Sequence, residues 1–356
     1  MSERWLRYAA AAVAFAVAAY IGIGVVGDFS AEASANTWAL WTAIALGAAF
    51  AAYAVVEYAQ TGTLASVSSQ FDTRTLALMP VAIAINIVLG AAVANAIKLP
   101  IYLDSIGTIL VGALAGPIPG ALTGLLSNVL WQYVMPPPFQ GTVAAAFAIV
   151  AAVIGLMAGI FGRVGMLRPR LHRTTAQLAL AGILTAGAIV ALAWLAYLGY
   201  QAIIGPAALE VASDNALFVA LGWFALALVA GTVIGIFVLL FVRRDLTAAY
   251  VVLCGALTGV VAALISAPIS ANLFGGVTGA GTDFVVAAFR QAGADIGAAT
   301  LGQGLLSDPI DKVVTYFVVY VVLIAMSVRA IARFPQGEML VEEPAEAPSA
   351  SPEAPT

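Results

Sequence analysis

Ten apolar stretches divide the chain between residues 5 and 330. A helix that crosses a bilayer needs about 20 mostly apolar residues, and most of these stretches have that length. They are residues 5–26, 37–58, 76–97, 101–116, 117–134, 141–161, 178–197, 217–242, 247–268 and 309–330. The fourth and fifth are short, and they fit either two spans or one broken pair around a Gly-Pro turn. The pattern predicts an all-α, polytopic membrane helix bundle with about ten transmembrane helices.

The distribution of basic residues predicts the orientation of these spans. Cytoplasmic loops of membrane proteins collect Lys and Arg. With the N-terminus in the cytoplasm, eleven arginines fall on the inside and three basic residues on the outside, namely Lys98, Arg290 and Lys312. We therefore predict that the N and C termini are both cytoplasmic. Residues 4–35 also imitate a cleaved signal peptide, but the run is long and a second span follows directly, so we favour a retained helix.

Composition agrees with a membrane protein and excludes several function classes. Hydrophobic residues make up 63% of the chain and charged residues 9%, whereas soluble domains carry about a quarter charged residues. No basic face suited to nucleic acid is present. The single cysteine, Cys254, and the single histidine, His172, provide no basis for a metal site. We expect no metal, no cofactor and no nucleic-acid partner.

Changes in composition indicate the domain organisation. A two-helix N-terminal membrane piece (1–58) is followed by a polar cytoplasmic linker (59–75) and an eight-span body (76–334). Residues 335–356 form an acidic tail rich in Pro and Ala, which cannot build a core and is predicted to be disordered. The sequence GALTG occurs at 120–124 and again at 255–259. This echo indicates either an internal repeat or coincidence in a chain rich in Ala, Gly and Leu.

Residues 99–132 carry the clearest candidate binding site. Glycines at four-residue spacing let neighbouring helix backbones approach closely, and polar groups inside a membrane usually face a protein interior or a water-filled cavity. Asp104 and Ser105 open the first apolar run, either as substrate ligands or as a helix cap. Asn128, Trp131 and Gln132 end the second run and suit a small planar polar solute. Trp131 is alternatively an interfacial anchor.

Residues 266–282 form a second candidate, because this stretch is too rich in glycine for a plain span. It is predicted to be a re-entrant or lid segment, which includes Asn272, or otherwise an external loop. Asp283 and Arg290 follow it on one helical face. Arg290 either binds a substrate carboxylate or phosphate or pairs with Asp283.

Two further groups are predicted to be structural. Asn86 and Asn95 lie inside the third span, where an amide most often joins helices through a hydrogen bond. Residues 307–312 (SDPIDK) have the pattern of a helix start, with Asp308 as the cap, Pro309 in the first helical position and Asp311 in the first turn.

The runs AINIVLG (84–90), LPIYLDSIGTILVGALAGPIPGALTGLLSN (99–128) and ISAPISANLFGGVTGAGTD (265–283) resemble the substrate-binding S component of energy-coupling factor (ECF) transporters. The resemblance spans about residues 76–330 and rests on the ordered Asp-Ser-x-Gly and Gly-Pro-x-Pro-Gly patterns. It implies a multi-pass protein of the prokaryotic cytoplasmic membrane. Such a protein captures a micronutrient, a vitamin or precursor, for import.

The resemblance also implies partners. A membrane scaffold subunit and ATPase subunits supply the energy in trans, which agrees with the lack of a phosphate-binding loop in this chain. Small residues on one helix face meet the scaffold in this family, and Ala91, Ala92 and Ala94 are the candidates here. The family commonly has six spans, whereas this body has eight. The alternative function is a membrane-embedded sensor acting through a separate signalling chain; an enzyme is the least favoured, because no catalytic constellation is present.

Overall fold

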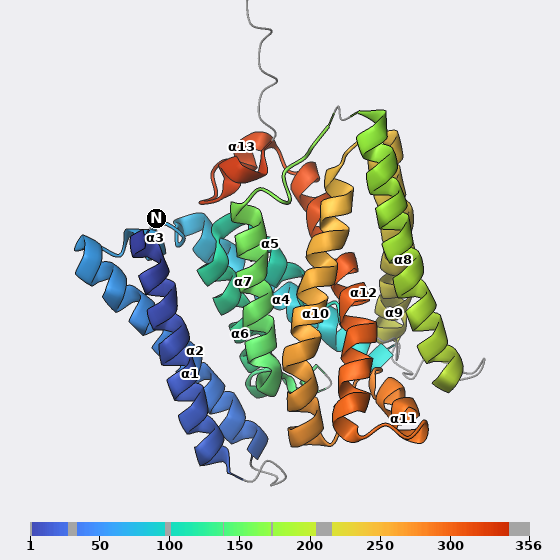
Figure 1. Cartoon of the computed structure of the whole chain (residues 1–356), viewed down its shortest axis with the longest axis horizontal. Coiled ribbons are helices and arrows are strands. Elements are labelled where there is room, and N and C mark those ends of the chain that lie inside the picture. Colours follow the sequence, from blue (N-terminus) through green and yellow to red (C-terminus); the bar gives the residue numbers. More distant parts are fainter. Residues whose placement is uncertain are drawn as a thin grey trace, which may run out of the picture.

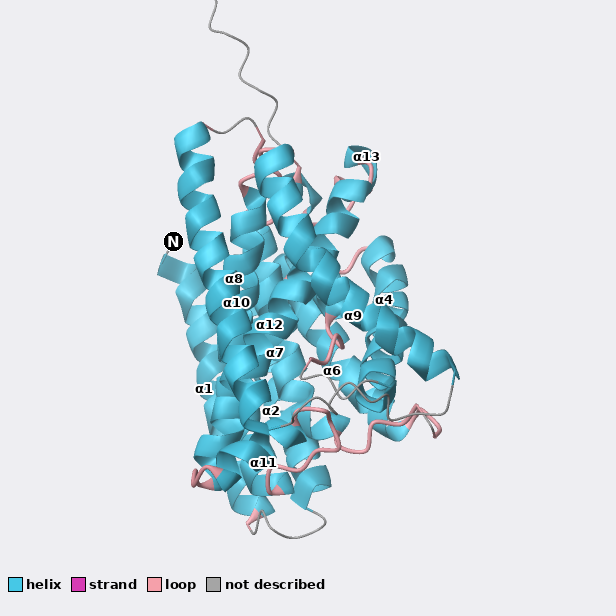
Figure 2. Ribbon diagram, turned by 90° about the vertical axis from the view of Figure 1, so that its right-hand side faces the viewer, coloured by secondary structure: helices cyan, strands magenta, loops and turns pink. Residues whose placement is uncertain are grey.

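The computed structural model describes residues 2–27, 34–96, 101–137, 139–171, 174–203 and 216–341. Every regular element within these ranges is a helix (Figures 1 and 2). The long α-helices are α1 (Ser2–Val26), α2 (Ser34–Thr61), α4 (Thr73–Ala96), α5 (Ile106–Ala115), α6 (Pro117–Tyr133), α7 (Ala148–Arg163), α8 (Thr175–Ile203), α9 (Ala216–Phe237), α10 (Thr247–Phe274) and α12 (Ile296–Ala325). Shorter elements are α3 (Ala65–Ser68), η1 (Ala144–Phe147), the π-helical turn η3 (Val238–Val242), α11 (Asp283–Gln291), α13 (Val328–Ile331) and η4 (Gly337–Leu340). The predicted all-α fold is confirmed.

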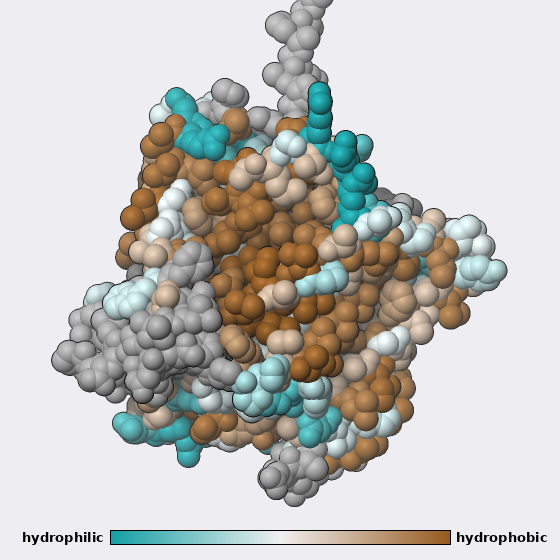
Figure 3. All heavy atoms as spheres, turned by 180° about the vertical axis from the view of Figure 1, so that it is seen from behind, coloured by the Kyte–Doolittle hydropathy of each residue, from teal (hydrophilic) through white to brown (hydrophobic). Residues whose placement is uncertain are grey.

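Five helices of the described chain are long and apolar enough to cross a membrane: Trp5–Val26, Ser34–Thr61, Thr73–Val93, Ala144–Arg163 and Thr247–Phe274. Three shorter apolar helices cover Ile106–Ala115, Thr175–Ala191 and Ala227–Val242. Apolar atoms cover the middle of the back face, and hydrophilic groups gather toward its top and bottom (Figure 3). These features are compatible with a multi-pass membrane protein. The count of ten spans and the orientation of the termini stay predictions.

Two predicted boundaries are wrong. The predicted helix start at Asp308–Pro309 lies in the middle of α12, which continues through Pro309. Proline is tolerated inside a helix where neighbouring elements compensate for its missing N–H. Likewise, α10 continues from residue 266 through Pro268 to Phe274, so only residues 275–282 are irregular. α10 ends at Gly275, whose φ of 58° is left-handed and therefore suits glycine.

Both copies of the GALTG pattern lie where two helices touch. A Cβ added to Gly124 in α6 would meet the carbonyl oxygen of Ala151 in α7 at 2.2 Å. One added to Gly259 in α10 would meet Cα of Pro309 in α12 at 2.3 Å. The two copies therefore perform the same packing role, because the missing side chain lets the backbones approach. This shared role does not establish an internal repeat.

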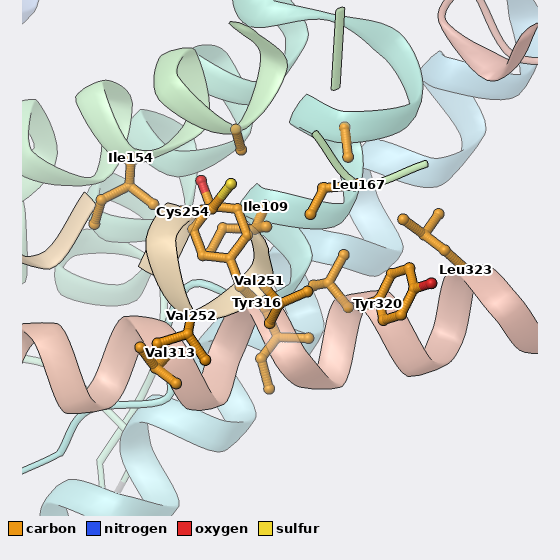
Figure 4. Packing of buried hydrophobic residues seen from close by; sticks show 14 of the residues in the cluster. Ile109, Ile154, Leu167, Val251, Val252, Cys254, Val313, Tyr316, Tyr320 and Leu323 are labelled. Carbon is orange, nitrogen blue, oxygen red and sulfur yellow. The ribbon is translucent and has the colours of Figure 1, made fainter. Parts of the chain in front are cut away.

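The interior joins the two pairs of helices into one core. Tyr316 and Tyr320 of α12 are fully buried beside Ile109, Ile154 and other apolar side chains (Figure 4). Within this core, the Tyr316 hydroxyl lies 3.1 Å from Thr258 Oγ1 of α10. α12 is therefore the central helix of the body, with its polar residues held against both α5 and α10.

The ends of the body differ from the predicted domain boundaries. α1 and α2 pack on one another as a hairpin at one side of the bundle (Figure 1), and the predicted linker contains the end of α2, all of α3 and the start of α4. Residues 335–341, predicted to be part of a disordered tail, are ordered. The Gln336 amide donates to the Leu114 carbonyl at 2.9 Å and Leu340 is buried. Residues 342–356 of the tail lie outside the described residues.

Candidate functional site

A buried lysine lies at the centre of the candidate site. Lys312, in the middle of α12, has a side chain only 4% exposed. Its Nζ donates to Ser105 Oγ at 2.7 Å, contacts the Asp311 carboxylate, and lies 3.6 Å from Asp104 Oδ1. Buried charges persist only when they are paired and hydrogen-bonded. We name Asp104, Ser105, Asp311 and Lys312 the ion cluster.

Asp311 also fixes the backbone that carries the rest of the cluster. Its side chain is fully buried, and Oδ1 accepts hydrogen bonds from the amides of Tyr102 at 3.0 Å and Leu103 at 2.8 Å. Leu103 has a φ of +53°, a left-handed conformation that costs a residue with a side chain about 1–2 kcal/mol. Strain of this kind persists where the surroundings fix it and often accompanies function.

A chain of hydrogen bonds extends the ion cluster along α12. The Tyr102 hydroxyl lies 3.0 Å from Thr282 Oγ1 and accepts from Gln303 at 3.4 Å. Gln303 also donates to Ser307 Oγ at 2.7 Å, and Ser307 in turn donates to Asp308 at 3.2 Å. Three acids (Asp104, Asp308 and Asp311), one lysine and several hydroxyls therefore line one polar path through an otherwise apolar bundle. Ionisable residues in such a position indicate a functional site.

Trp131 of α6 lies beside Asp104 of the ion cluster. A Cβ added to Gly90 of α4 would meet the Trp131 ring at 2.6 Å and Asp104 Cβ at 3.0 Å, so the indole and the Asp104 side chain both pack against this glycine. Asn128 lies one helical turn before Trp131. It is 5% exposed, and its side chain forms no hydrogen bond within the described chain. Its amide offers a donor and an acceptor that the protein does not use.

Asn86 has the structural role that the sequence predicts. Its amide nitrogen donates to Thr108 Oγ1 at 2.8 Å and Ser127 Oγ at 3.0 Å, while Oδ1 accepts from the Gly107 amide at 2.7 Å. These bonds join α4, α5 and α6 beneath the candidate site. The side chain of Asn95 lies outside the described residues.

Trp131 and Gln132 also hold the segment that follows α6. Trp131 Nε1 donates to the Phe139 carbonyl at 2.7 Å, and Gln132 Oε1 accepts from the Ala145 amide at 2.8 Å. Gln132 Nε2 lies 3.4 Å from Asn36 Oδ1 of α2. The described contacts of Gln132 are therefore structural, although Trp131 still borders Asp104.

The second candidate stretch meets the polar path at two residues: Thr282 Oγ1 lies 3.0 Å from the Tyr102 hydroxyl, and Ser266 Oγ donates to Asp308 Oδ2 at 3.5 Å. The three predicted ligands of this region have other contacts. Asp283 accepts hydrogen bonds from Thr278 and from the Gly279 amide, which closes the turn before α11. Arg290 donates to the Ala294 carbonyl at 2.9 Å and forms no ion pair with Asp283. Asn272 is exposed and donates to the Pro268 carbonyl of its own helix. These three predicted ligands have local structural contacts in the described chain.

The predicted partner-facing alanines are not on a surface. Ala91 and Ala92 are each 1% exposed, because α4 packs against α5, α6 and α9. They therefore present nothing to a separate subunit in this structure, which corrects the prediction for these two residues. The side chain of Ala94 lies outside the described residues.

Sequence reasoning missed the residues of α12. The sequence pattern predicts a helix start at Asp311 and Lys312 and an external position for Lys312, yet both are buried in the middle of a helix. Two signals in the sequence identify them: Lys312 is one of only two lysines in the chain, and it follows an acid within a predicted span.

The site contains no conventional metal ligand set. Across the described ranges, no three His, Cys, Asp or Glu side chains gather closely enough to hold a metal ion. Comparison with known proteins gave no match to a protein family, to a characterised protein or to a solved structure.

Proposed function

We propose that this chain is an integral membrane protein that captures a small polar solute between Asn128, Trp131 and the ion cluster. The observation that carries this proposal is the Asn128 amide: the residue is only 5% exposed, and its side chain has no hydrogen-bond partner in the described chain. Neither amide atom is fully buried, so the group stays accessible to a solute. A bound solute with a complementary donor and acceptor would form hydrogen bonds that the protein does not supply.

The remaining groups suit the same solute. Trp131 offers a flat ring beside Asp104, and Asp104 is the most exposed charged member of the ion cluster, at 25%. Lys312 also donates to Ser105 and contacts Asp311, so it would keep two partners if Asp104 moved away. Asp104 is therefore the acid best able to bind a donor group of the solute. A planar ring that carries amide-like or amino groups fits this arrangement.

In its specific form, the proposal is the substrate-capturing subunit of an ECF-type importer for a vitamin or vitamin precursor. This form rests on the sequence resemblance, and it assigns energy supply to separate scaffold and ATPase subunits. The proposed solute site lies within this one chain, and the sequence contains no phosphate-binding loop. Both features are consistent with solute capture by this chain and ATP hydrolysis by other subunits.

The test is thermal stabilisation of the detergent-purified protein across a panel of vitamins and precursors. A ligand that binds only the folded state raises the apparent melting temperature by mass action. We expect one compound to do so, and Asn128→Ala to weaken its binding about tenfold by removing hydrogen bonds to the solute. Asn272→Ala is the matched control, because that amide is exposed and bonds only its own helix.

The specific form needs a second measurement. Tagged protein purified gently from its native membrane is expected to retain a scaffold subunit and two ATPases. A ligand-induced shift without these partners would support capture but contradict the importer. No shift for any compound, in protein shown to be folded, would contradict solute capture.

A further inference from the structure

A cavity lies between the α1–α2 hairpin and the body. Its volume is about 580 Å³. Lining residues come from α1, α2, α3, the end of α7 and the C-terminal segment, and they include Arg7, Tyr53, Glu57, Arg163 and Gln336. None of these belongs to the proposed solute site.

Two buried side chains on this cavity have polar atoms that the described protein leaves unbonded. Glu57 is 2% exposed: Oε1 forms an ion pair with Arg7 Nη1 at 3.2 Å and accepts a hydrogen bond from the Ser66 amide at 2.8 Å, whereas Oε2 has no hydrogen bond. Gln336 is 6% exposed, and neither atom of its amide group is bonded. Each such group costs free energy unless a partner is supplied.

The charges on the cavity are not balanced. Arg7 pairs with Glu57, which leaves the positive charge of Arg163 on the lining. Arg163 is exposed and forms no ion pair within the described ranges. A guanidinium of this kind binds phosphate or carboxylate with two parallel hydrogen bonds. The cavity thus presents a site for an anion, and its lining also includes an unbonded carboxylate oxygen, which requires a donor.

The position of the cavity favours a lipid headgroup over other phosphates. Arg7 and Tyr8 lie in the first turns of α1, whereas Tyr53 and Glu57 lie in the last turns of α2. Both helices are long and apolar enough to span a membrane. The ends of such helices lie at the level of the headgroups, where tyrosine and arginine are characteristic.

We propose that this cavity binds a zwitterion in which a phosphate is joined to a primary ammonium, the headgroup of an aminophospholipid. Arg163 and the Gln336 amide nitrogen hold the phosphate. Glu57 Oε2 and the Gln336 amide oxygen accept from the ammonium. A quaternary ammonium carries no N–H donor, and a glycerol headgroup carries no cation, so neither satisfies both ends of the site.

The test measures thermal stabilisation of delipidated protein in detergent micelles doped with phosphatidylethanolamine, phosphatidylcholine or phosphatidylglycerol. A fourth sample receives soluble glycerophosphoethanolamine. We expect phosphatidylethanolamine to bind about tenfold more tightly than the other two lipids, the effect of losing one charge-assisted hydrogen bond. An equal effect of the soluble compound would support the same chemistry and assign a soluble source.

Two variants locate the binding. Arg163→Gln and Gln336→Leu should each reduce the preference for phosphatidylethanolamine about tenfold. Gln336→Leu should also leave the delipidated protein at least as stable as before, because it replaces an unbonded buried amide with an apolar group of similar shape. That separates lost binding from lost folding. Arg329→Gln, an equal change of charge outside the cavity lining, is the control.

Three results would overturn the proposal. They are equal stabilisation by all three phospholipids, a preference that both variants retain, and no stabilisation by any zwitterion tested. A preference for phosphatidylglycerol would likewise overturn it, because the ammonium would then have no role.

Discussion

Lys312 Nζ donates a 2.7 Å hydrogen bond to Ser105 Oγ across 207 positions of the chain. This contact links the middle of α12 to the residue that immediately precedes α5, in the interior of the bundle. The ammonium also contacts Asp311, whose other oxygen holds the amides of Tyr102 and Leu103. α12 therefore holds the segment before α5 in its conformation. A substitution in the ion cluster should change the structure of both segments.

Replacing Lys312 by Met is expected to destabilise the protein strongly. It leaves the buried Asp311 carboxylate without its cation, which costs about 3–5 kcal/mol. Asp311→Asn combined with Lys312→Met removes both charges. The double variant should therefore lose less unfolding free energy than the sum of the losses in the two single variants. Unfolding in mixed micelles by titration with dodecyl sulfate measures each free energy. Strictly additive losses would show that the two charges are not coupled.

Asn86 and Asn128 should differ in how much stability the same substitution costs. Asn86→Ala removes three hydrogen bonds and leaves the Gly107 amide without a partner, so we expect a loss of about 1–3 kcal/mol in stability. Asn128→Ala removes no hydrogen bond within the described chain, so stability should change by less than about 1 kcal/mol. The same unfolding titration compares the two. A larger loss for Asn128→Ala would contradict its assignment as an unpartnered amide.

The apolar pattern predicts which segments are helical, because each long helix needs a continuous apolar run and these runs are local in the sequence. Asn86 is another local success: an amide surrounded by small residues predicts a hydrogen bond between helices, and the structure contains it. One stretch of sequence also predicts Asp104, Ser105 and Trp131 as site residues. In the structure, Asp104 and Ser105 belong to the ion cluster and Trp131 lies beside Asp104.

The residues of α12 were misread for a physical reason. Asp-Pro is a strong local signal for a helix start, but tertiary packing overrides it. Gly259 lets α10 approach the backbone at Pro309, and the acid after the proline, Asp311, has its partners in another segment of the chain. The partner of Asp311 is 208 positions away, at Leu103. No local pattern contains that information, and the left-handed φ of Leu103 is equally hidden, because leucine rarely adopts it.

Arg244 offers a test of backbone strain in the loop before α10. Its φ is +53°, whereas the preceding Arg243 has a φ of −85°. Glycine adopts the left-handed region without the side-chain penalty, so Arg244→Gly should be more stable than Arg243→Gly by about 1–2 kcal/mol. Both variants lose one positive charge from an exposed position. Thermal unfolding in one detergent compares them directly, and equal stabilities would contradict the strained conformation.

Close packing of α10 on α12 gives the sharpest prediction about the fold. Gly259→Ala places a methyl group 2.3 Å from Cα of Pro309, and backbone atoms cannot move aside as a flexible side chain can. We expect a loss of at least about 1–3 kcal/mol from overpacking. Because Pro309 precedes Asp311 and Lys312 by less than one turn, the displacement should also weaken solute binding at Asn128.

Gly47→Ala is the matched control: nothing lies within 4 Å of its added Cβ, so the alanine should stabilise α2 by up to about 1 kcal/mol. Unfolding titrations and the ligand-induced thermal shift measure the two effects. Gly259→Ala with unchanged stability would show that α10 and α12 are farther apart than the structure places them.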